Sequence, residues 1–561
     1  MAQIIECVPN FSEGQNSAVI QQITDEIQKV EGVRLLNVDP GKATNRSVVT
    51  FVGSPAAVVE AAFLAIKKAG ELIDMSRHTG EHPRMGATDV CPLIPIAGIS
   101  MEETAEWAKK LAERVGKELQ IPVYLYEAAQ PDKKRSNLSV IRAGEYEGFF
   151  KKIKQPEWAP DFGPAEFDAR RGGTVIGARD FLVAYNVNLN TTSTRRANSI
   201  AFDVREAGRV KREGHPVTGK IVTDDQGKPV HIPGSLKAVK AIGWYIEEYG
   251  MAQISINLTN IHITPMHVAF DEVCRKAAER GIRVTGSELV GLIPLQAMLD
   301  AGKYFLHKQQ RSTGVSEKEL IRIAVLSMGL DELGPFNPEE RIIEYLLRDK
   351  ADHKLVSMPL ADFSDETASE SPAPGGGSIA AYVGALGASL ATMVANLSSH
   401  KKGWDERWEE FSDWADKGQE YKNELIRLVD ADTRAFNGIM TAFGLPKGSE
   451  EEKATRTRAI QEATKTAIEI PFRVMEVAYA SMEVIAAMAE KGNPNSVSDA
   501  GVGALCARAG VMGAFMNVRI NTAGYADKVF VADVIARGKE IEDKAMAMEA
   551  GILKIVNEKI I

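Results

Sequence analysis

Strand-like and helix-like stretches alternate through the first 300 residues, and their order limits the fold more than any other feature of the sequence. The start, QIIECVPNFSEG, is strand-like, and it is followed by an amphipathic helix over 16–30, strands over 33–40 and 46–53, a helix over 54–73 and a strand over 88–96. This βαββαβ order is that of the ferredoxin-like motif. We therefore expect an α/β region that begins with a ferredoxin-like subdomain.

The same order recurs from about residue 180, without obvious sequence identity. The stretch from Phe181 alternates strictly: one face carries Phe181, Val183, Tyr185, Val187 and Leu189, and the other carries Asn186, Asn188 and Asn190. A helix is expected over 195–208, strands over 252–259 and 261–264, a helix over 265–281 and a strand over 282–290. The segment 219–234 is predicted to be an added hairpin that turns at Asp225-Gln226-Gly227.

From about residue 315 the pattern becomes helical, and beyond residue 356 long Ala-, Met- and Glu-rich segments keep a period of about 3.6 residues. We expect an all-α helical bundle there. The predicted division is an N-terminal subdomain over 1–180, a second ferredoxin-like subdomain over 181–326, a linker over 327–356 and the helical domain over 357–561.

The composition excludes several classes of protein. The net charge is −9, whereas a broad nucleic-acid surface requires a basic face, so we expect no nucleic-acid partner. The four cysteines, Cys7, Cys91, Cys274 and Cys506, are scattered, which is typical of a reducing cytoplasm without disulfides. The first residues have no basic stretch followed by a long apolar one, so no signal peptide is predicted.

One segment imitates a membrane span. Residues 371–399 carry no charge and are long enough to cross a bilayer, but they are mostly Ala, Gly and Ser. Such residues gain little from insertion into lipid. We expect a buried helix whose small residues let its neighbours approach closely, and no membrane span.

The loop RHTGEHPRMGATDVCP, residues 77–92, concentrates ionisable side chains between glycines and prolines. A zinc finger would need a Cys pair upstream, and only Cys7 is there. His78 and His82 have metal-site spacing, but Gly80 and Pro83 interrupt the helix that such a site requires. The remaining possibilities are an acid–base loop and a purely structural loop, and the residues alone leave both open.

Several longer motifs carry a family resemblance. ECVPNFSEG, DMSRHTGEHPRMGATDVCPLIP, PVYLYEAA, IRAGEYEGF and EWAPDFGP resemble the formiminotransferase half of the bifunctional formimidoyltransferase-cyclodeaminases. SPAPGGGSIAA, LVDADTRAF and NVRIN resemble their cyclodeaminase half. One departure is the segment from Arg205 to Leu236, which carries the added hairpin and is longer than expected of the vertebrate forms.

The resemblance implies transfer of a formimino group from N-formimino-L-glutamate to tetrahydrofolate, followed by closure to 5,10-methenyltetrahydrofolate with loss of ammonia, in histidine degradation. It assigns acid–base roles to His82 in the transferase and Asp432 in the cyclodeaminase, and Asp39 is a candidate to orient His82. It also implies a folate-binding segment formed by Gly163, Pro164, Ala165, Glu166, Phe167, Asp168, Ala169, Arg170, Arg171 and Gly172.

Each assignment has a simpler alternative in the residues themselves. Asp39 precedes Pro40 and could form a turn, Arg170 and Arg171 could be a solvated basic loop instead of a clamp for a folate carboxylate, and Asp432 could face solvent. Asp430 and Asp432 are two residues apart on a helix, so at most one faces a given pocket.

The expected co-substrate is tetrahydrofolate in its polyglutamylated form, with no metal or redox cofactor, and the expected assembly is a homo-oligomer built from dimers. Two other functions stay open. One is a transferase alone, with a helical half that has no activity, and the other is a non-catalytic folate-binding scaffold.

Overall fold

A computed structural model describes residues 3–41, 45–80, 83–214, 219–347 and 354–560. The chain forms two compact units, an α/β unit of Met1–Ala297 with Met328–Leu347 and a helical unit of Met298–Ser327 with Arg348–Ile561. The coarse expectation of an α/β region followed by a helical region is confirmed. Residues 298–327 pack with the helical unit, however, whereas the sequence placed the end of the α/β part at residue 326.

The first sheet has seven strands: β1 (Ile4–Cys7), β2 (Asn10–Phe11), β3 (Val33–Gly41), β4 (Arg46–Gly53), β5 (Thr88–Ala97), β6 (Val123–Glu127) and β7 (Thr174–Ala178). β1 and β2 both pair antiparallel with β4 on one side and with β5 on the other. β3 lies antiparallel at the outer side of β4, while β7 and β6 extend the sheet in parallel beyond β5. The strands expected in the first 100 residues are confirmed.

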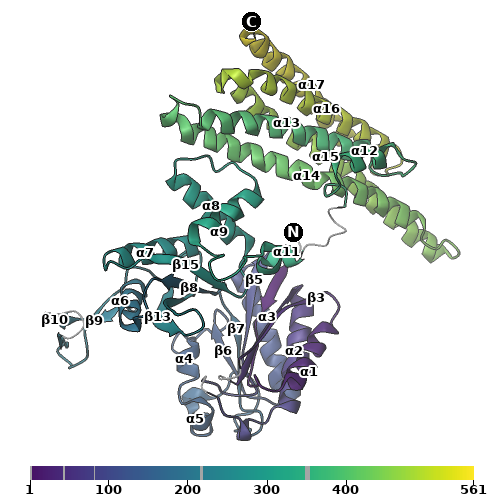
Figure 1. The fold of residues 1–561 in the computed structure, drawn as a ribbon. Helices are drawn as coiled ribbons and strands as arrows, with labels where there is room; N and C mark the ends of the chain where they lie inside the picture. The colour runs from purple at the N-terminus through teal and green to yellow at the C-terminus, as the bar shows by residue number, and fades with distance from the viewer. Residues whose placement is uncertain (1–2, 42–44, 81–82, 215–218, 348–353, 561) are drawn as a thin grey trace. The chain divides into compact units, whose positions relative to one another are not determined.

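Helices cover both faces of this sheet (Figure 1). The apolar core on one face joins the sheet to α1 (Ser17–Gln28), α2 (Pro55–Leu72) and α3 (Met101–Arg114). The other face is covered along β5, β7 and β6 by α4 (Leu138–Ile141) and α5 (Glu145–Lys152). The β3–β4 half of that second face carries polar side chains instead.

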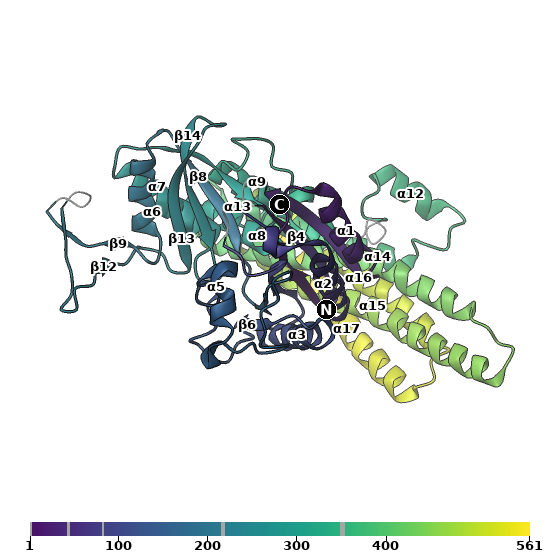
Figure 2. The ribbon, with the colours of Figure 1, turned by 90° about the horizontal axis from the view of Figure 1, so that it is seen from below.

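The second sheet is antiparallel, in the order β13 (Val239–Ile246), β14 (Met251–Leu258), β8 (Val183–Leu189) and β15 (Val284–Val290). Two helices, α6 (Thr194–Val204) and α7 (Met266–Ala278), lie side by side on one of its faces (Figure 2). Val183, Tyr185, Val187 and Leu189 are fully buried, as their alternation predicts.

One predicted strand is wrong. Residues 261–264 form a turn, because the Asn260 side chain accepts the backbone N–H groups of His262 and Ile263 and Pro265 follows. The strand that pairs with β14 in its place is β13, which the sequence pattern missed because Gly243 interrupts its apolar alternation. A Cβ at Gly243 would lie 2.3 Å from the backbone nitrogen of Asn198, so α6 approaches the sheet closely at that position.

The added hairpin is a narrow arm that extends from the second sheet (Figures 1 and 2). It consists of two small antiparallel ladders, one of β9 (Arg209–Val210) with β12 (His231–Ile232) and one of β10 (Arg212–Glu213) with β11 (Lys220–Ile221).

After the second sheet the chain is helical, through α8 (Leu295–Lys308), α9 (Glu317–Met328), α10 (Pro338–Arg341), α11 (Ile343–Leu347), α12 (Leu360–Ala368), α13 (Gly376–Ser399), α14 (Trp408–Phe443), α15 (Glu450–Lys491), α16 (Val497–Thr522) and α17 (Lys528–Lys559). A Cβ at Gly387 of α13 would lie 2.8 Å from the Gly503 carbonyl of α16. Small residues therefore let these two helices pack closely, as predicted for the uncharged segment.

Two helical segments, Gly376–Ser399 and Pro494–Thr522, are long and apolar enough to cross a membrane by length and composition. Their apolar windows are 61% and 50% buried inside the protein, and the core helices of globular proteins pass the same test.

Candidate active sites

The loop after α2 lies beside the expected folate-binding segment. Gly86 and Gly172 form an isolated antiparallel bridge, and the backbone N–H of Ala87 donates to the Arg171 carbonyl at 2.8 Å. Two segments about 90 residues apart in the sequence thus meet at one end of the first sheet.

His78 is fixed in this loop by bonds at both ring nitrogens. Arg84 Nε donates to His78 Nδ1 at 3.3 Å, and since a guanidinium only donates, Nδ1 is the acceptor and Nε2 carries the hydrogen toward the Asn45 carbonyl, 2.8 Å away. Arg84, with a side chain only 8% exposed, also binds Glu147 through two nitrogens, at 2.6 and 2.9 Å. The structural interpretation therefore holds for His78, which has no ring nitrogen left for a metal.

His82 lies outside the described residues, so its predicted role stays a prediction. The chain on either side of His82 is hydrogen-bonded to residues at the start of β4. Asn45 Nδ2 donates to the Thr79 carbonyl at 2.9 Å, and Arg46 Nη1 donates to the Pro83 carbonyl at 3.4 Å. Among the residues the structure describes, no group of three or more His, Cys, Asp or Glu side chains is arranged to hold a metal ion.

Asp39 belongs to a strand and not to a turn, because both it and Pro40 lie in β3. Asp39 pairs with Val48 of β4, and Asn10 of β2 pairs with the same Val48 from the other side, so the three side chains share one face. Arg46 lies on this face too and donates to Asn10 Oδ1 at 2.7 and 3.0 Å. The register thus places Asp39, which is exposed, on the polar half of the sheet.

Asp89, the second residue of β5, was not singled out by any sequence pattern. It is fully buried, and its Oδ2 accepts from Arg46 at 2.9 Å and from Arg142 at 2.7 Å, while Oδ1 accepts the Met85 N–H at 3.0 Å. Burial lowers the pKa of Arg46 to about 10, although Asp89 opposes the change. Two guanidinium groups hold this carboxylate, which fixes the end of the loop.

Glu6 is a second charged group that sequence patterns did not single out. It pairs with Val52 of β4, four residues from Val48, so it shares the polar face with Asp39. Its side chain is 2% exposed, and burial raises its pKa to about 7 against the opposing charge of Arg179. A carboxyl group that titrates near neutrality is a frequent feature of functional sites. The only feature of the sequence that could have pointed to Glu6 is that a charged residue stands inside a short apolar strand.

The glycines of the segment 163–172 serve the packing of the chain itself. Gly163 and Gly172 have φ angles of +81° and +69°, and a Cβ there would lie 2.3 Å from the Ile121 carbonyl and 2.2 Å from the Met85 carbonyl, respectively. The close approach expected from these glycines is made to backbone groups of this chain.

The two arginines of this segment differ. Arg171 is occupied, since its guanidinium donates to Asp168 at 2.5 Å and to the carbonyls of Leu119 and Gln120 at 2.7 and 3.3 Å. Arg170 is exposed and donates through Nη2 to one backbone carbonyl at 2.7 Å. Arg171 is thus engaged within the chain, whereas the Arg170 guanidinium is exposed.

The asparagine-bearing face of β8 is engaged internally. Asn186 donates to Glu288 at 3.0 Å, Gln253 donates to Asn188 at 2.8 Å, and Asn188 donates to Glu332 at 2.6 Å. Asn188 and Gln253 are 0% and 1% exposed. The amides of this face are thus bound within the chain, and Glu288 is the half-buried carboxylate among their partners.

In the helical unit, Asp432 of α14 lies at the N-terminus of α13. Its Oδ2 is 3.1 Å from Ser378 Oγ, and it also accepts the Ser378 backbone N–H. A Cβ at Gly377 would lie 2.2 Å from Asp432 Oδ1, so only glycine leaves room for the carboxylate. Burial raises the pKa of Asp432, against the two donors from Ser378. The alternative of a solvent-facing aspartate is excluded.

Asp430 points elsewhere, as the helical spacing predicts. It is 5% exposed and accepts the backbone N–H groups of Leu355 and Val356 at 2.9 and 3.2 Å. Asp430 therefore fixes the segment before α12, and of the two aspartates only Asp432 contacts the start of α13.

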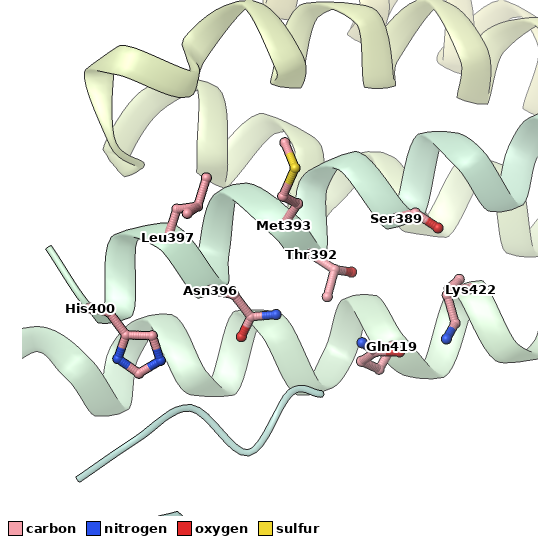
Figure 3. Close-up of a pocket in the computed structure, with 8 residues that line it drawn as sticks. All are labelled: Ser389, Thr392, Met393, Asn396, Leu397, His400, Gln419 and Lys422. Carbon is pink, nitrogen blue, oxygen red and sulfur yellow. The ribbon is translucent and has the colours of Figure 1, made fainter. Parts of the chain in front are cut away.

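A pocket of about 460 Å³ lies between α13 and α14 (Figure 3), lined by Ser389, Thr392, Met393, Asn396, Leu397, His400, Gln419 and Lys422. Lys422 precedes Asp432 by ten helical residues, about 15 Å along the axis. Burial lowers the pKa of Lys422 and that of His400. The pocket is thus separate from the Asp432 carboxylate but on the same pair of helices.

Two neighbouring helices expose uncharged stripes with alternating spacings of four and three residues. The stripe of α13 consists of the half-exposed or exposed apolar residues Ile379, Val383, Leu386, Leu390, Met393 and Leu397, and that of α16 consists of Val502, Leu505, Ala509, Met512 and Met516. Such spacing is that of helices packed in a coiled coil.

Comparison with known proteins covers both units. Family models match the formiminotransferase domain, N-terminal subdomain, over residues 4–179, the formiminotransferase domain over 184–348, and formiminotransferase-cyclodeaminase over 359–540. The formimidoyltransferase-cyclodeaminase of Mus musculus is 43% identical over 99% of this chain and 98% of its own length.

Two further relatives match about half and about a third of this chain. The glutamate formimidoyltransferase of Streptococcus pyogenes serotype M1 is 40% identical over 54% of this chain and 94% of its own length. The methenyltetrahydrofolate cyclohydrolase of Methylorubrum extorquens is 41% identical over 35% of this chain and 91% of its own length. With a relative this similar along the whole chain, the protein belongs to the formimidoyltransferase-cyclodeaminase family.

Proposed function

We propose that this chain is a bifunctional folate enzyme of histidine degradation. It transfers the formimino group of N-formimino-L-glutamate to N5 of tetrahydrofolate, and it then closes the product to 5,10-methenyltetrahydrofolate with release of ammonia. The similarity to a bifunctional relative over 98% of that relative's length supports both activities in one chain. The observation that carries the second activity is the buried Asp432 carboxylate at the start of α13. The scattered free cysteines favour a cytoplasmic location.

For the transfer, N5 of the folate attacks the formimino carbon, loses a proton, and the glutamate nitrogen leaves after it gains one. One imidazole suffices for both proton transfers, and we assign it to His82. Asp39 lies on the polar face of the sheet whose β4 end anchors both flanks of the His82 loop, so it can orient and charge-stabilise an imidazole there. The segment 163–172 is the proposed folate site, with exposed Arg170 for a folate carboxylate.

For the cyclisation, N10 attacks the same carbon and ammonia leaves. Asp432 takes the proton from N10 and returns it to the departing nitrogen. A carboxyl group can do both, and burial raises the pKa of Asp432, which favours the protonated state that the step requires. The free N–H groups at the start of α13 can stabilise a carboxylate or developing negative charge at this site.

We also propose that the α/β unit consists of two ferredoxin-like subdomains. The support is the strand order, β3-β4-β1-β5 in one and β13-β14-β8-β15 in the other, with antiparallel neighbours throughout. Each group of four strands has helices against one face. The parallel strands β7 and β6 are then an extension of the first subdomain.

The test mixes the purified full-length protein with formiminoglutamate and tetrahydrofolate, and follows methenyltetrahydrofolate absorbance and ammonium together. We expect both products from the wild type, neither from His82→Ala, and an accumulated formimino intermediate from Asp432→Asn. Consumption of formiminoglutamate without ammonium would leave a transferase alone. The absence of any turnover, with folate still bound, would favour the scaffold.

A second candidate for the helical unit is hydrolysis of the methenyl bridge, because a methenyltetrahydrofolate cyclohydrolase matches it at 41% identity. Both reactions occur at the same carbon. Supplying 5,10-methenyltetrahydrofolate directly distinguishes the two reactions. With a cyclodeaminase, the absorbance of this compound decreases at the uncatalysed rate, whereas a cyclohydrolase makes it decrease faster.

We propose that the co-substrate is polyglutamylated and that the pocket between α13 and α14 receives its anionic tail. Lys422 is half-buried with a lowered pKa, so a carboxylate beside it would restore a favourable environment for its charge. Lys422→Ala is expected to raise the KM for a polyglutamylated substrate and to leave the KM for the monoglutamate unchanged. Equal KM changes for both would contradict this assignment.

We propose that the apolar stripes of α13 and α16 contact the same stripes of a second copy, which makes the protein a homo-oligomer. An uncharged stripe is complementary to itself, as a two-fold interface requires, and two adjacent helices from each copy would form a four-helix packing. Leu386→Lys is expected to lower the mass measured by light scattering. The control is Lys544→Glu, on the exposed side of α17, which should leave the mass unchanged.

A further inference from the structure

Ser378 contacts three oxygen atoms, and these contacts determine how Asp432 can change its protonation state. Ser378 Oγ lies 3.1 Å from Asp432 Oδ2, 2.9 Å from the Val429 carbonyl oxygen and 3.2 Å from Thr433 Oγ1. The Ser378 side chain is fully buried, so water does not replace these partners. A serine hydroxyl has one hydrogen and accepts through its lone pairs, so it donates to one neighbour at a time.

The direction of these bonds follows from the charge on Asp432. When the carboxylate is ionised, it only accepts, so the two groups are hydrogen-bonded when the Ser378 hydrogen points to Oδ2. When Asp432 is protonated, its own hydrogen points to Ser378 Oγ, and the Ser378 hydrogen turns to the Val429 carbonyl, which only accepts. In both states every hydroxyl hydrogen between Asp432 and Val429 has an acceptor.

We propose that Ser378 is a positioning residue that hydrogen-bonds Asp432 in both protonation states, by turning its hydroxyl between Asp432 Oδ2 and the Val429 carbonyl. The inference rests on the proposed role of Asp432 in cyclisation and goes beyond it. A fixed donor such as a backbone N–H stabilises the ionised carboxylate more than the protonated group and offers no acceptor for the carboxyl hydrogen, so it opposes each protonation.

The proton balance of the step is closed. The formimino substrate carries one positive charge as an amidinium group; the bond between N10 and the carbon forms, and Asp432 takes the N10 proton. The same proton then passes to the departing nitrogen, its bond to carbon breaks, and neutral ammonia leaves the methenyl cation. Asp432 ends ionised as it began, and Ser378 only rotates its O–H bond.

The groups that the structure shows in contact with Asp432, Gly377 and Ser378, are uncharged. α13 contributes Gly377 and Ser378, and α16 contributes the amide of Asn517, which lies beside Gly376. The causes of the raised pKa of Asp432 are burial, opposed by the Ser378 hydroxyl and N–H, and no charged side chain is among them. Because no charged group among these causes outweighs the effect of the Ser378 hydroxyl, loss of this hydroxyl should raise the pKa of Asp432 further.

The experiment supplies 5-formiminotetrahydrofolate directly to the full-length protein and records the cyclisation rate against pH. Ser378→Ala is expected to lower kcat about tenfold. This loss is smaller than the 10²–10⁴-fold that an acid–base group itself typically contributes to the rate, because Ser378 acts through Asp432. Its acidic limb should move to higher pH, because a hydrogen bond to the ionised carboxylate is stronger than one to the protonated group, so the ionised state loses more. The control is Ser481→Ala, a fully buried serine of α15 that donates to the Ala478 carbonyl, and its kcat and limb should match the wild type.

Asp432→Asn, assayed beside these variants, distinguishes a failure of the proposed role of Asp432 from a failure of the proposed role of Ser378. If it cyclises at the wild-type rate, the role of Asp432 itself is wrong. If it is inactive while Ser378→Ala keeps the wild-type kcat and acidic limb, the site stands and the turning hydroxyl is overturned. Should Ser378→Ala fail to fold, Ser378→Cys takes its place, since a thiol is a weak donor and should shift the limb in the same direction.

Discussion

The two units each bury an aspartate, and its surroundings differ. Asp89 in the α/β unit is held by two guanidinium groups and a backbone N–H, whereas Asp432 in the helical unit is held by a hydroxyl and a backbone N–H. Paired cations keep a carboxylate ionised, while uncharged donors leave it free to exchange a proton. Charge compensation, together with the deeper burial of Asp89, separates the structural aspartate from the half-buried catalytic candidate.

The largest effect on stability should follow from Asp89→Asn. The substitution leaves Arg46 and Arg142 buried with half of their acceptor lost, and breaking such a pair typically costs about 3–5 kcal/mol. Urea unfolding measures the loss, with exposed Asp331→Asn as the control. A loss under about 1 kcal/mol would mean that the contrast between the two aspartates has no energetic basis.

Glu6 lies between these extremes, since it is buried with a single opposing cation. Its pKa of about 7 in the folded protein, against 4.5 in a free side chain, corresponds to about 3 kcal/mol. Because the folded-state pKa is raised, the stabilising contribution is complete below pH 4.5 and is lost as the pH rises through 7. We expect Glu6→Gln to raise the unfolding free energy at pH 8 by up to about 3 kcal/mol, and hardly at all at pH 4.

The measurement is urea unfolding at pH 4, 6 and 8, with exposed Glu31→Gln as the matched control. Equal gains at all three pH values would show that Glu6 does not titrate in this range, and would remove it from the functional candidates.

Gly377→Ala tests the helical site by geometry alone. The added Cβ would lie 2.2 Å from Asp432 Oδ1, so the carboxylate must move, and a displacement of about 1 Å can cost about 10²-fold in rate. Gly551→Ala in α17 is the control, because its Cβ meets nothing within 4 Å. Unchanged cyclisation of 5-formiminotetrahydrofolate by Gly377→Ala would argue that the reaction occurs elsewhere.

How far the sequence predicted these features depends on how local they are. The repeated βαββαβ order and the opposite directions of Asp430 and Asp432 follow from periodicity within one segment. The meeting of Asp39 with Asn10 and Arg46 depends on strand register, which no single segment records. The partners of Asp89 and Arg171 come from segments about 50 residues away, so occupied arginines looked the same as free ones.

The smallest effect belongs to Asp430→Asn, which sharpens the comparison within one helix. An amide keeps one acceptor oxygen, so one of the N–H groups of Leu355 and Val356 loses its partner, at a cost of about 1.5 kcal/mol. Cyclisation should stay within about twofold of wild type, because Asp430 does not reach the start of α13, whereas Asp432→Asn should lose at least about 10²-fold. Both variants change the same charge two residues apart, so net charge and helix propensity are matched. Equal losses of activity would mean that the segment fixed by Asp430 takes part in the reaction, and the site would then extend from α13 to the start of α12.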